Sequence, residues 1–219
     1  MIKNIIFDFD GVLVDSEAII AKSFSKYLAD KNIFFSEKQF YEQAGKKTIE
    51  IVSEISSKYG TLDQKLFYQD LMSISNNLYS KYLKPIDGII KFLENTDHKR
   101  YIGSNNTKQK IINGLRKVNL HNHFKSSSIF SFDIVKKAKP LPDIYLKPFE
   151  VDNLQKKETI IIEDSLVGVK AAVAAGVRVV VITAGSHWYE GRSKKELHEA
   201  GAFEVVNSFT EMLKLINKL

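Results

Sequence analysis

The sequence predicts an α/β protein in which a doubly wound parallel sheet, a Rossmann-like core, is interrupted by an inserted all-helical domain. Short runs rich in Ile and Val alternate with helical patterns, which is the order of βαβ units. These runs lack the polar alternation of a half-exposed strand, so helices should cover both faces of the sheet. The alternation breaks once, over roughly seventy residues that hold helical patterns only, far more than a crossover connection needs.

The strands and helices of the expected core follow one another along the chain. The expected strands cover residues 2–9, 100–104, 128–132, 159–162, 177–183 and, with a weaker pattern, 203–206. The helices between them are expected at 86–95, 108–118, 142–150, 167–175 and 194–200. Parallel strands joined by such helices form right-handed crossovers, which gives the doubly wound arrangement.

The inserted segment contains four helical patterns and no convincing strand. They cover residues 17–30, 36–44, 48–58 and 63–82. We therefore expect a core domain of residues 1–15 and 85–219 and a helical domain of residues 16–84. The hinges between them are expected after Asp15 and at the turn from Lys84 to Gly88.

Composition excludes several classes of chemistry. The chain has 219 residues, 44% of them hydrophobic, and no cysteine, so thiol nucleophiles, disulfides and cysteine metal sites are excluded. The net charge of +6 comes from scattered lysines, which are typical of a solvated surface that attracts anionic metabolites. No lysine cluster is interleaved with aromatic residues, and we therefore expect no nucleic-acid partner.

The N-terminal stretch and the apolar runs indicate in which compartment the protein is expected. An acid at position 8 interrupts the first apolar run, so a signal peptide is not expected. No apolar run approaches the roughly 20 residues that a membrane span needs. We expect a cytoplasmic protein without membrane contact, as a monomer or a weak dimer.

Two aspartates follow the first expected strand. Asp8 and Asp10 are two residues apart, so on extended chain they point to the same face, and Gly11 permits a tight turn after them. The carboxyl end of a strand is where open α/β sheets bind ligands. Two close carboxylates repel each other unless a cation or proton neutralises them, and Mg²⁺ suits such oxygen ligands. Taken alone, the pair could equally be solvated acids in a turn.

Polar residues also follow the second and third expected strands. Ser104 stands where a strand leads into a helix, and its hydroxyl together with backbone N–H groups would hold an anion. Helix capping by Asn106 or Thr107 is the simpler alternative there. Lys139 lies in a segment stiffened by Pro140 and Pro142, which limits the entropy lost in holding its ammonium in place.

Two further acids end the fourth expected strand. Glu163 and Asp164 are adjacent, so their side chains should point in opposite directions and act differently. One should join Asp8 and Asp10, and the other should hold a metal-bound water or Lys139. Carboxylates, a lysine, a hydroxyl and a helix N-terminus at the same edge of one sheet predict a site for magnesium and phosphate.

Four segments resemble the haloacid dehalogenase superfamily, in its branch with a helical cap after the first motif: DFDGVLVDS, GSNNT, AKPLPDIYL and IIIEDSLVGVKAAVAAGV. The resemblance covers the core, and it is strongest to sugar-phosphate phosphatases, phosphoglycolate phosphatases and β-phosphoglucomutase. It implies that Asp8 is the nucleophile and that Asp10 is the acid and base. An acid at position 10 is typical of phosphoryl-transfer members.

The resemblance also implies the remaining roles in the core. Mg²⁺ would be bound by Asp8, the Asp10 backbone carbonyl and Asp164, with Glu163 near its waters. Ser104 and the Asn105 amide would hold phosphate oxygens, and Lys139 would stabilise the spreading charge.

The cap bears on the substrate. A loop with Gly45, Lys46 and Lys47 matches the family's substrate loop, and its lysines would meet a carboxylate or a second phosphate; two solvated lysines are an equal alternative. Mutase relatives carry a histidine and an arginine where this chain has Ile20 and Thr48, which favours hydrolysis.

The sequence therefore predicts a Mg²⁺-dependent phosphatase that forms an aspartyl phosphate. Its expected substrate is a small anionic phosphomonoester, a sugar or organic-acid phosphate such as 6-phosphogluconate. A β-phosphoglucomutase-like phosphomutase is the first alternative. A catalytically idle module that binds a phosphorylated metabolite or a protein is the second, and the intact acids disfavour it.

Overall fold

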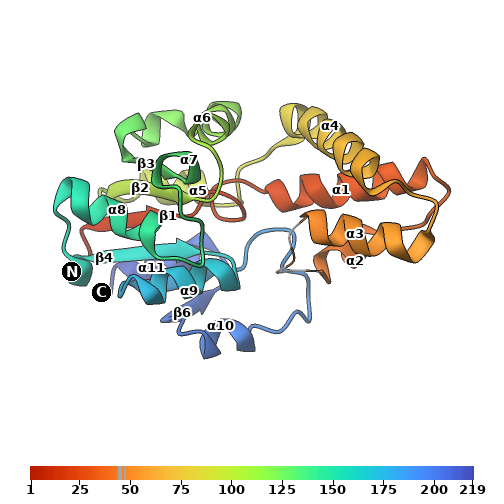
Figure 1. Ribbon diagram of the computed structural model, residues 1–219. Coiled ribbons are helices and arrows are strands. Elements are labelled where there is room, and N and C mark those ends of the chain that lie inside the picture. Colours follow the sequence, from red (N-terminus) through yellow and green to blue (C-terminus); the bar gives the residue numbers. More distant parts are fainter. Residues whose placement is uncertain (44–45, 47) are drawn as a thin grey trace. The chain divides into compact units, whose positions relative to one another are not determined.

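Six parallel strands form one sheet in the order β3-β2-β1-β4-β5-β6 (Figure 1). The computed structural model describes residues 1–43, 46 and 48–219. The strands are β1 (Asn4–Phe7), β2 (Lys99–Ser104), β3 (Ile129–Ser131), β4 (Thr159–Glu163), β5 (Arg178–Ile182) and β6 (Glu204–Val206). Each coincides with an expected strand, and the predicted doubly wound parallel sheet is confirmed. The strand order reverses direction between β1 and β4.

The strand register brings the ends of β1, β2 and β4 level with one another. Ile6 of β1 is paired with Tyr101 of β2 on one side and with Ile161 of β4 on the other. All residues of β1 and β4 are buried, as expected of central strands covered on both faces. The residues that directly follow β1 and end β4 therefore lie side by side.

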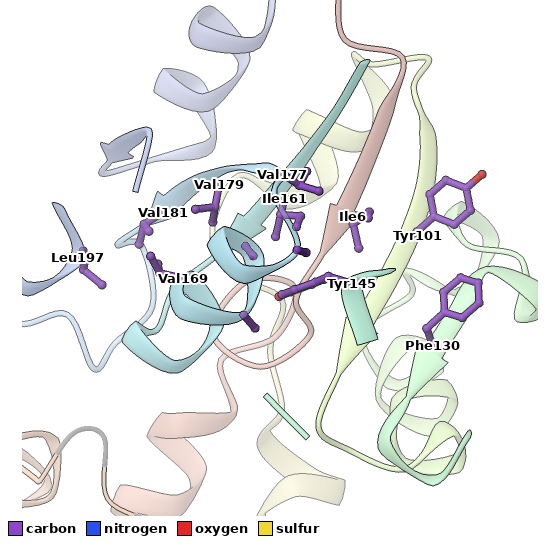
Figure 2. Close-up of a cluster of buried hydrophobic side chains, with 13 residues drawn as sticks. Ile6, Tyr101, Phe130, Tyr145, Ile161, Val169, Val177, Val179, Val181 and Leu197 are labelled. Atoms are coloured by element: carbon purple, nitrogen blue, oxygen red, sulfur yellow. The ribbon is translucent and has the colours of Figure 1, made fainter. Parts of the chain in front are cut away.

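Helices cover both faces of the sheet. Those described in the core are α5 (Ile89–Glu94), α6 (Lys108–Lys117), α7 (Phe132–Val135), α8 (Asp143–Asp152), α9 (Leu166–Ala174), α10 (Lys195–Glu199) and α11 (Phe209–Ile216). On one face, side chains of the strands pack against α8, α9 and α10 in the cluster drawn in Figure 2, which includes Tyr145, Val169 and Leu197. On the other face, the Phe7 ring meets the Phe92 ring edge to face, and Phe92 in turn contacts Phe209 of α11.

Residues 16–83 form a second compact unit, which interrupts the chain between β1 and β2. Its described helices are α1 (Ser16–Ala29), α2 (Glu37–Tyr41), α3 (Thr48–Tyr59) and α4 (Gln64–Tyr82). Phe24 is fully buried in the core of this unit, and Ile20 packs against the same cluster. Tyr27 stacks on Phe67 with ring centroids 4.3 Å apart. Position 20 is therefore part of the helical packing.

The first unit consists of residues 1–15 and 84–219, so Lys84 belongs to it. Its two chain connections to the inserted segment run side by side, because Val14 and Pro85 form an antiparallel bridge and the Asp15 N–H donates to the Lys84 carbonyl. Each unit has its own apolar core.

Some elements lie outside the expected ones. Two helices, α7 and α11, are additional; α7 has only four residues, too short for a periodic pattern, and α11 begins where Ser208 caps it. The part of the chain that the structure describes also forms three short 3₁₀ helices: η1 (His121–His123), η2 (Ser126–Ser128) and η3 (Lys156–Glu158). Among the described residues, no helix combines the length and the apolar character that crossing a membrane requires.

Candidate active site

The predicted motif residues of the core gather at the carboxyl edge of the sheet, where the strand order reverses. Asp8 directly follows β1, Ser104 ends β2, and Glu163 ends β4, the strand beside β1. The Asp8 N–H donates to the Ile162 carbonyl, 2.9 Å away, which continues the β1–β4 pairing by one residue. Open α/β sheets bind ligands at this point.

A buried lysine joins two of the acids. The Lys139 ammonium donates to Asp8 Oδ1 at 2.5 Å and to Glu163 Oε1 at 2.7 Å. Its side chain is only 4% exposed, and the Glu163 side chain is fully buried. Of the two roles left open for the acids after β4, Glu163 therefore takes the one that holds the lysine.

Glu163 is held from every side. Its Oε1 also accepts from the Tyr145 hydroxyl at 2.5 Å, and its Oε2 accepts from the Asp164 N–H at 2.9 Å. The Ser165 N–H and hydroxyl both donate to Oε2, at 3.2 and 3.0 Å. Five hydrogen bonds thus fix a carboxylate whose burial would otherwise be costly.

Two glycines provide the space for these acids. A Cβ on Gly11 would lie 1.7 Å from Asp164 Oδ2, and a Cβ on Gly168 would lie 1.7 Å from Glu163 Oε1. Gly11 also has a φ of +70°, which side-chain-bearing residues rarely adopt. The glycine of the first motif therefore serves two needs, the turn itself and the close approach of Asp164.

The acids differ in their affinity for protons. Burial raises the pKa of Asp8 well above its ordinary value, and the charges of Glu163 and Asp164 add to this against the opposing effect of Lys139. Burial and the Glu163 charge likewise raise the pKa of Asp164. Burial alone would raise the pKa of Glu163 too, but Lys139 and the hydrogen bonds bring it below the ordinary value. Burial disfavours the charged ammonium, yet Asp8 and Glu163 raise the pKa of Lys139 to about 12.

The carboxylates at this edge of the sheet outnumber the positive charges beside them. Oxygen atoms of Asp8, Glu163 and Asp164 lie within 4.8 Å of one another, all three residues being buried. Among the residues that the structure describes, Lys139 is the only buried lysine or arginine. One ammonium cannot neutralise three carboxylates, and the remaining negative charge adds to the effect of burial in raising the pKa values of Asp8 and Asp164. A divalent cation with oxygen ligands fits this donor set.

Asp10 lies outside this cluster of three. Its Oδ2 accepts a short hydrogen bond from the Asn106 side-chain amide, and the Asn106 N–H donates to Ser104 Oγ at 3.2 Å. The cap of α6 is Thr107, whose hydroxyl accepts from the Lys110 N–H. Asn106 thus binds the second aspartate instead of capping the helix.

Asn105 anchors the lysine segment. Its Oδ1 accepts from the Lys139 N–H at 2.8 Å, and its Nδ2 donates to the Lys139 carbonyl at 3.4 Å. The Asn105 side chain therefore fixes the backbone of a residue 34 positions further along the chain. The polar residues after β2 hold Asp10 and Lys139 in place.

The loop after β5 supplies a histidine to the site. His187 is buried, and its Nε2 lies 3.0 Å from Asp164 Oδ2. The Trp188 indole N–H donates to the Asp164 carbonyl at 3.1 Å, and the Arg192 guanidinium lies over the Trp188 ring. These contacts place the loop after β5 beside the acidic residues that end β4.

The predicted cap residues are only partly described. Gly45 and Lys47 lie outside the described residues. The Lys46 ammonium contacts both carboxylate oxygens of Glu54 at 2.7 Å and Gln43 Oε1 at 3.0 Å, all within the second unit. Binding of substrate by Lys46 stays a prediction.

Sequence reasoning missed two residues of the site. Tyr145 lies two residues after Asp143, and nothing in a helical pattern distinguishes it from an ordinary core aromatic. Figure 2 shows it among the buried side chains, with its oxygen at the tip. His187 lies in the loop after β5, and no spacing rule connects it to Asp164.

Comparison with known proteins yields one family. The model of the haloacid dehalogenase-like hydrolases matches residues 5–182. A solved haloacid dehalogenase-like protein of unknown function from Agrobacterium tumefaciens is 30% identical and superposes with a TM-score of 0.89, covering 100% of this chain and 99% of the other.

The curated relatives with functional names include two phosphatases of phosphorylated sugars and sugar acids. The 6-phosphogluconate phosphatase of Escherichia coli is 24% identical over 188 residues, which cover 85% of each chain. The phosphorylated carbohydrates phosphatase of Thermotoga maritima is 26% identical over 223 residues, covering 99% of each chain.

Proposed function

The chain belongs to the haloacid dehalogenase-like hydrolase family and is a phosphatase, and from this premise we propose that it hydrolyses small anionic phosphomonoesters through an intermediate on Asp8. The observation that supports this most is the buried pairing of Asp8 with Lys139 beside a second acid, Asp164, at the carboxyl edge of the sheet. A carboxylate fixed in this way is suited to attack phosphorus.

The first step transfers the phosphoryl group to the enzyme. Lys139 already engages Oδ1 of Asp8, so we assign the attack to Oδ2. A bond forms between this oxygen and phosphorus while the ester P–O bond breaks, and its electron pair leaves with the alcohol oxygen. Asp10, held by Asn106, donates the proton that this oxygen needs. The products of this step are the free alcohol and an aspartyl phosphate.

The second step restores the enzyme. Water attacks phosphorus, and Asp10, now a carboxylate, takes the proton from the attacking water. The bond between phosphorus and Asp8 breaks, its electrons return to the carboxylate, and inorganic phosphate leaves. The same residue thus acts first as an acid and then as a base.

We propose Mg²⁺ as the cation of the acidic cluster. Asp8, Asp164 and the Asp10 backbone carbonyl would hold it. When bound, it offsets the charge of the carboxylates and of the substrate phosphate. Glu163 lies within the same cluster, but five hydrogen bonds already engage its oxygens, so we assign it the positioning of Lys139.

Lys139 and Ser104 stabilise the phosphoryl group in transfer. The pKa of Lys139, about 12, keeps the ammonium charged throughout the physiological range. Preorganised charge aimed at the reacting oxygens lowers the barrier because it needs no reorganisation during the reaction. Ser104, at the end of β2, would donate its hydroxyl to a phosphate oxygen.

The substrate class follows from the relatives and from the charge of the chain. Two relatives act on 6-phosphogluconate and on phosphorylated carbohydrates, as their names state. The net charge of +6 favours anionic substrates. We propose a sugar or organic-acid phosphate, with 6-phosphogluconate first among the candidates. Phosphomutase activity is less favoured, because Ile20 packs into the helical core where mutase relatives carry a histidine.

A panel of phosphate esters with Mg²⁺ tests the proposal. The wild type should release phosphate from at least one sugar or organic-acid phosphate, and Asp8→Asn should lower kcat by about a thousandfold or more. Quenching with acid during turnover of a ³²P-labelled substrate should leave a label that hydroxylamine removes. Asp143→Asn is the matched control, because Asp143 pairs with exposed Lys137 and contacts none of the acids.

Two results would contradict the proposal. Turnover by Asp8→Asn at the wild-type rate would exclude attack by Asp8. Release of no phosphate from any ester would support an idle binding module instead. Glucose 1-phosphate with a bisphosphate activator distinguishes the mutase, which would yield an isomerised sugar phosphate.

A further inference from the structure

A second cavity opens at the amino edge of the sheet, at the opposite ends of the strands from the acidic cluster. It has a volume of about 450 Å³ and is formed by the start of β2, the 3₁₀ helices η1 and η2 before β3, and the end of α8. Such a volume is within the range of small-molecule sites, which run from roughly 300 to 1,000 Å³.

The lining of this cavity is basic. Lys99, Arg100 and Lys125 face it, together with His98 and His123. Asp152 is the one acid among the described residues that line it, and the Tyr101 hydroxyl donates to that carboxylate at 2.8 Å. Figure 2 shows the Tyr101 hydroxyl pointing away from the rest of the apolar cluster. Three permanent cations therefore face one carboxylate that already accepts a hydrogen bond.

The hydrogen bonds of Arg100 fix the position of its guanidinium and the tautomer of His123. One terminal nitrogen donates to the Leu93 carbonyl at 2.5 Å and to the Thr96 carbonyl, and the other lies 3.2 Å from His123 Nδ1. Because a guanidinium only donates, His123 Nδ1 must accept, and the proton of the neutral ring is on Nε2. His123 therefore presents an N–H donor.

Several polar groups of the cavity have no protein partner. Arg100 Nε and His98 Nδ1 are buried and make no hydrogen bond with any described residue. Within the same part of the chain, no hydrogen bond or ion pair engages the ammonium groups of Lys99 and Lys125. The two buried nitrogens are closed to a ligand, whereas the exposed ammonium groups of Lys99 and Lys125 are open to one with acceptor oxygens.

We propose that this cavity binds a small phosphorylated metabolite, with its phosphate between Lys99, Arg100 and Lys125. The cations and N–H donors suit an anionic group with several acceptor oxygens. The volume exceeds that of a lone phosphate, and the serine hydroxyls of η2 suit a polar, sugar-like remainder. The site is separate from the acidic cluster and does not rest on the proposed function.

Histidines among the five in the chain can report separately on the basic cavity and on the acidic cluster. His98 and His123 line the cavity, His187 contacts Asp164, and His198 lies on α10 as a reference. NMR of the imidazole C–H groups, on wild-type protein stripped of divalent metal, would follow a titration with glucose 6-phosphate. We expect saturable shifts of His98 and His123, while His198 stays unchanged.

Matched variants identify the charges involved. Lys99→Ala combined with Lys125→Ala should raise the dissociation constant by about tenfold or more. Lys170→Ala combined with Lys214→Ala removes the same charge from exposed helix positions and should leave it unchanged. Glucose, which lacks the phosphate, should cause no saturable shift.

Three outcomes would overturn the proposal. The first is an absent or linear, unsaturated response of His98 and His123 to glucose 6-phosphate. The second is an equal response to glucose. The third is an unchanged dissociation constant in the Lys99 and Lys125 double variant.

Discussion

The two edges of the sheet carry charged clusters of opposite kind. At the carboxyl edge, buried carboxylates of Asp8, Glu163 and Asp164 surround Lys139. At the amino edge, basic residues line a cavity open to solvent, and the Lys99 ammonium has no partner among the described residues. Burial explains the difference, because charges removed from water need partners, whereas exposed ones are stabilised by the solvent. Substitutions at the two edges should therefore differ in how strongly they affect stability and activity.

The largest effect is expected for Lys139→Met. The substitution leaves Asp8 and Glu163 without their cation, which should lower kcat by roughly a thousandfold and the free energy of unfolding by about 3–5 kcal/mol. Phosphate release and urea denaturation measure the two effects. Lys137→Met is the matched control: Lys137 is exposed and pairs with Asp143 at the surface, so both quantities should stay near wild type. Similar losses in both variants would contradict a special role for Lys139.

Glu163→Gln should have the next largest effect on turnover. If Glu163 positions Lys139, kcat should fall by roughly a hundredfold, with little change in the affinity for Mg²⁺. Asp164→Asn should instead weaken Mg²⁺ binding, which calorimetry measures directly. Loss of Mg²⁺ affinity in Glu163→Gln would show that this residue holds the cation.

Arg100→Met tests the stability of the amino edge. The guanidinium donates to the carbonyls of Leu93 and Thr96 through one nitrogen. A single hydrogen bond of this charged kind contributes about 1.5–3 kcal/mol, and because this site is only partly buried we expect the two bonds together to stay within that range. The free energy of unfolding should fall by a value in that range, less than for Lys139→Met. An equal or larger loss would contradict the comparison between the edges.

Tyr145→Phe should lower the stability less than Lys139→Met or Arg100→Met does. It removes one hydroxyl that donates to Glu163 and keeps the ring that packs in the core cluster. Leaving a buried acceptor short of one donor costs about 1–3 kcal/mol, and the other donors to Glu163 should keep the loss near the lower end. Urea denaturation measures the change, and an unaltered stability would show that this hydrogen bond contributes nothing.

The smallest effect concerns pH at the amino edge. Burial and the Arg100 charge lower the pKa of His98 and of His123, although the acids Asp97 and Glu94 oppose this. As the pH falls below the ordinary histidine value of about 6.5, the unfolded chain takes up protons before the folded one, so stability declines. Replacing both histidines with Gln should reduce this decline. Denaturation curves at neutral and mildly acidic pH measure it, and equal declines would contradict the expectation.

Local pattern was sufficient for most elements of the fold. Every expected strand is present, because Ile and Val runs such as 159–162 are buried on both faces wherever they lie in a parallel sheet. Short or irregular elements were not predictable: α7 spans four residues, and no period can be read from so few. The eight residues of α11 do carry a local signal that the prediction missed, because Ser208 caps the helix and Phe209, Met212 and Ile216 recur at helical spacing.

The sequence by itself determined which residue types stand at the ends of the strands. Asp8 and Glu163 each border an apolar run, and parallel strands bring such positions to one edge of the sheet whatever the details of packing. The glycine after Asp10 and the stiff segment around Lys139 could also be read directly, since both are properties of neighbouring residues.

Only the tertiary structure decided which of these groups touch. Lys139 and Asp8 are 131 positions apart, and the choice of Glu163 rather than Asp164 as the second partner of the lysine depends on atomic distances. His187 beside Asp164, and the cavity built from residues 98 to 152, likewise join segments that no local pattern connects. Pairing of this kind is set by three-dimensional packing, because charge and hydrogen-bond energies depend on separation in space and not on separation along the chain.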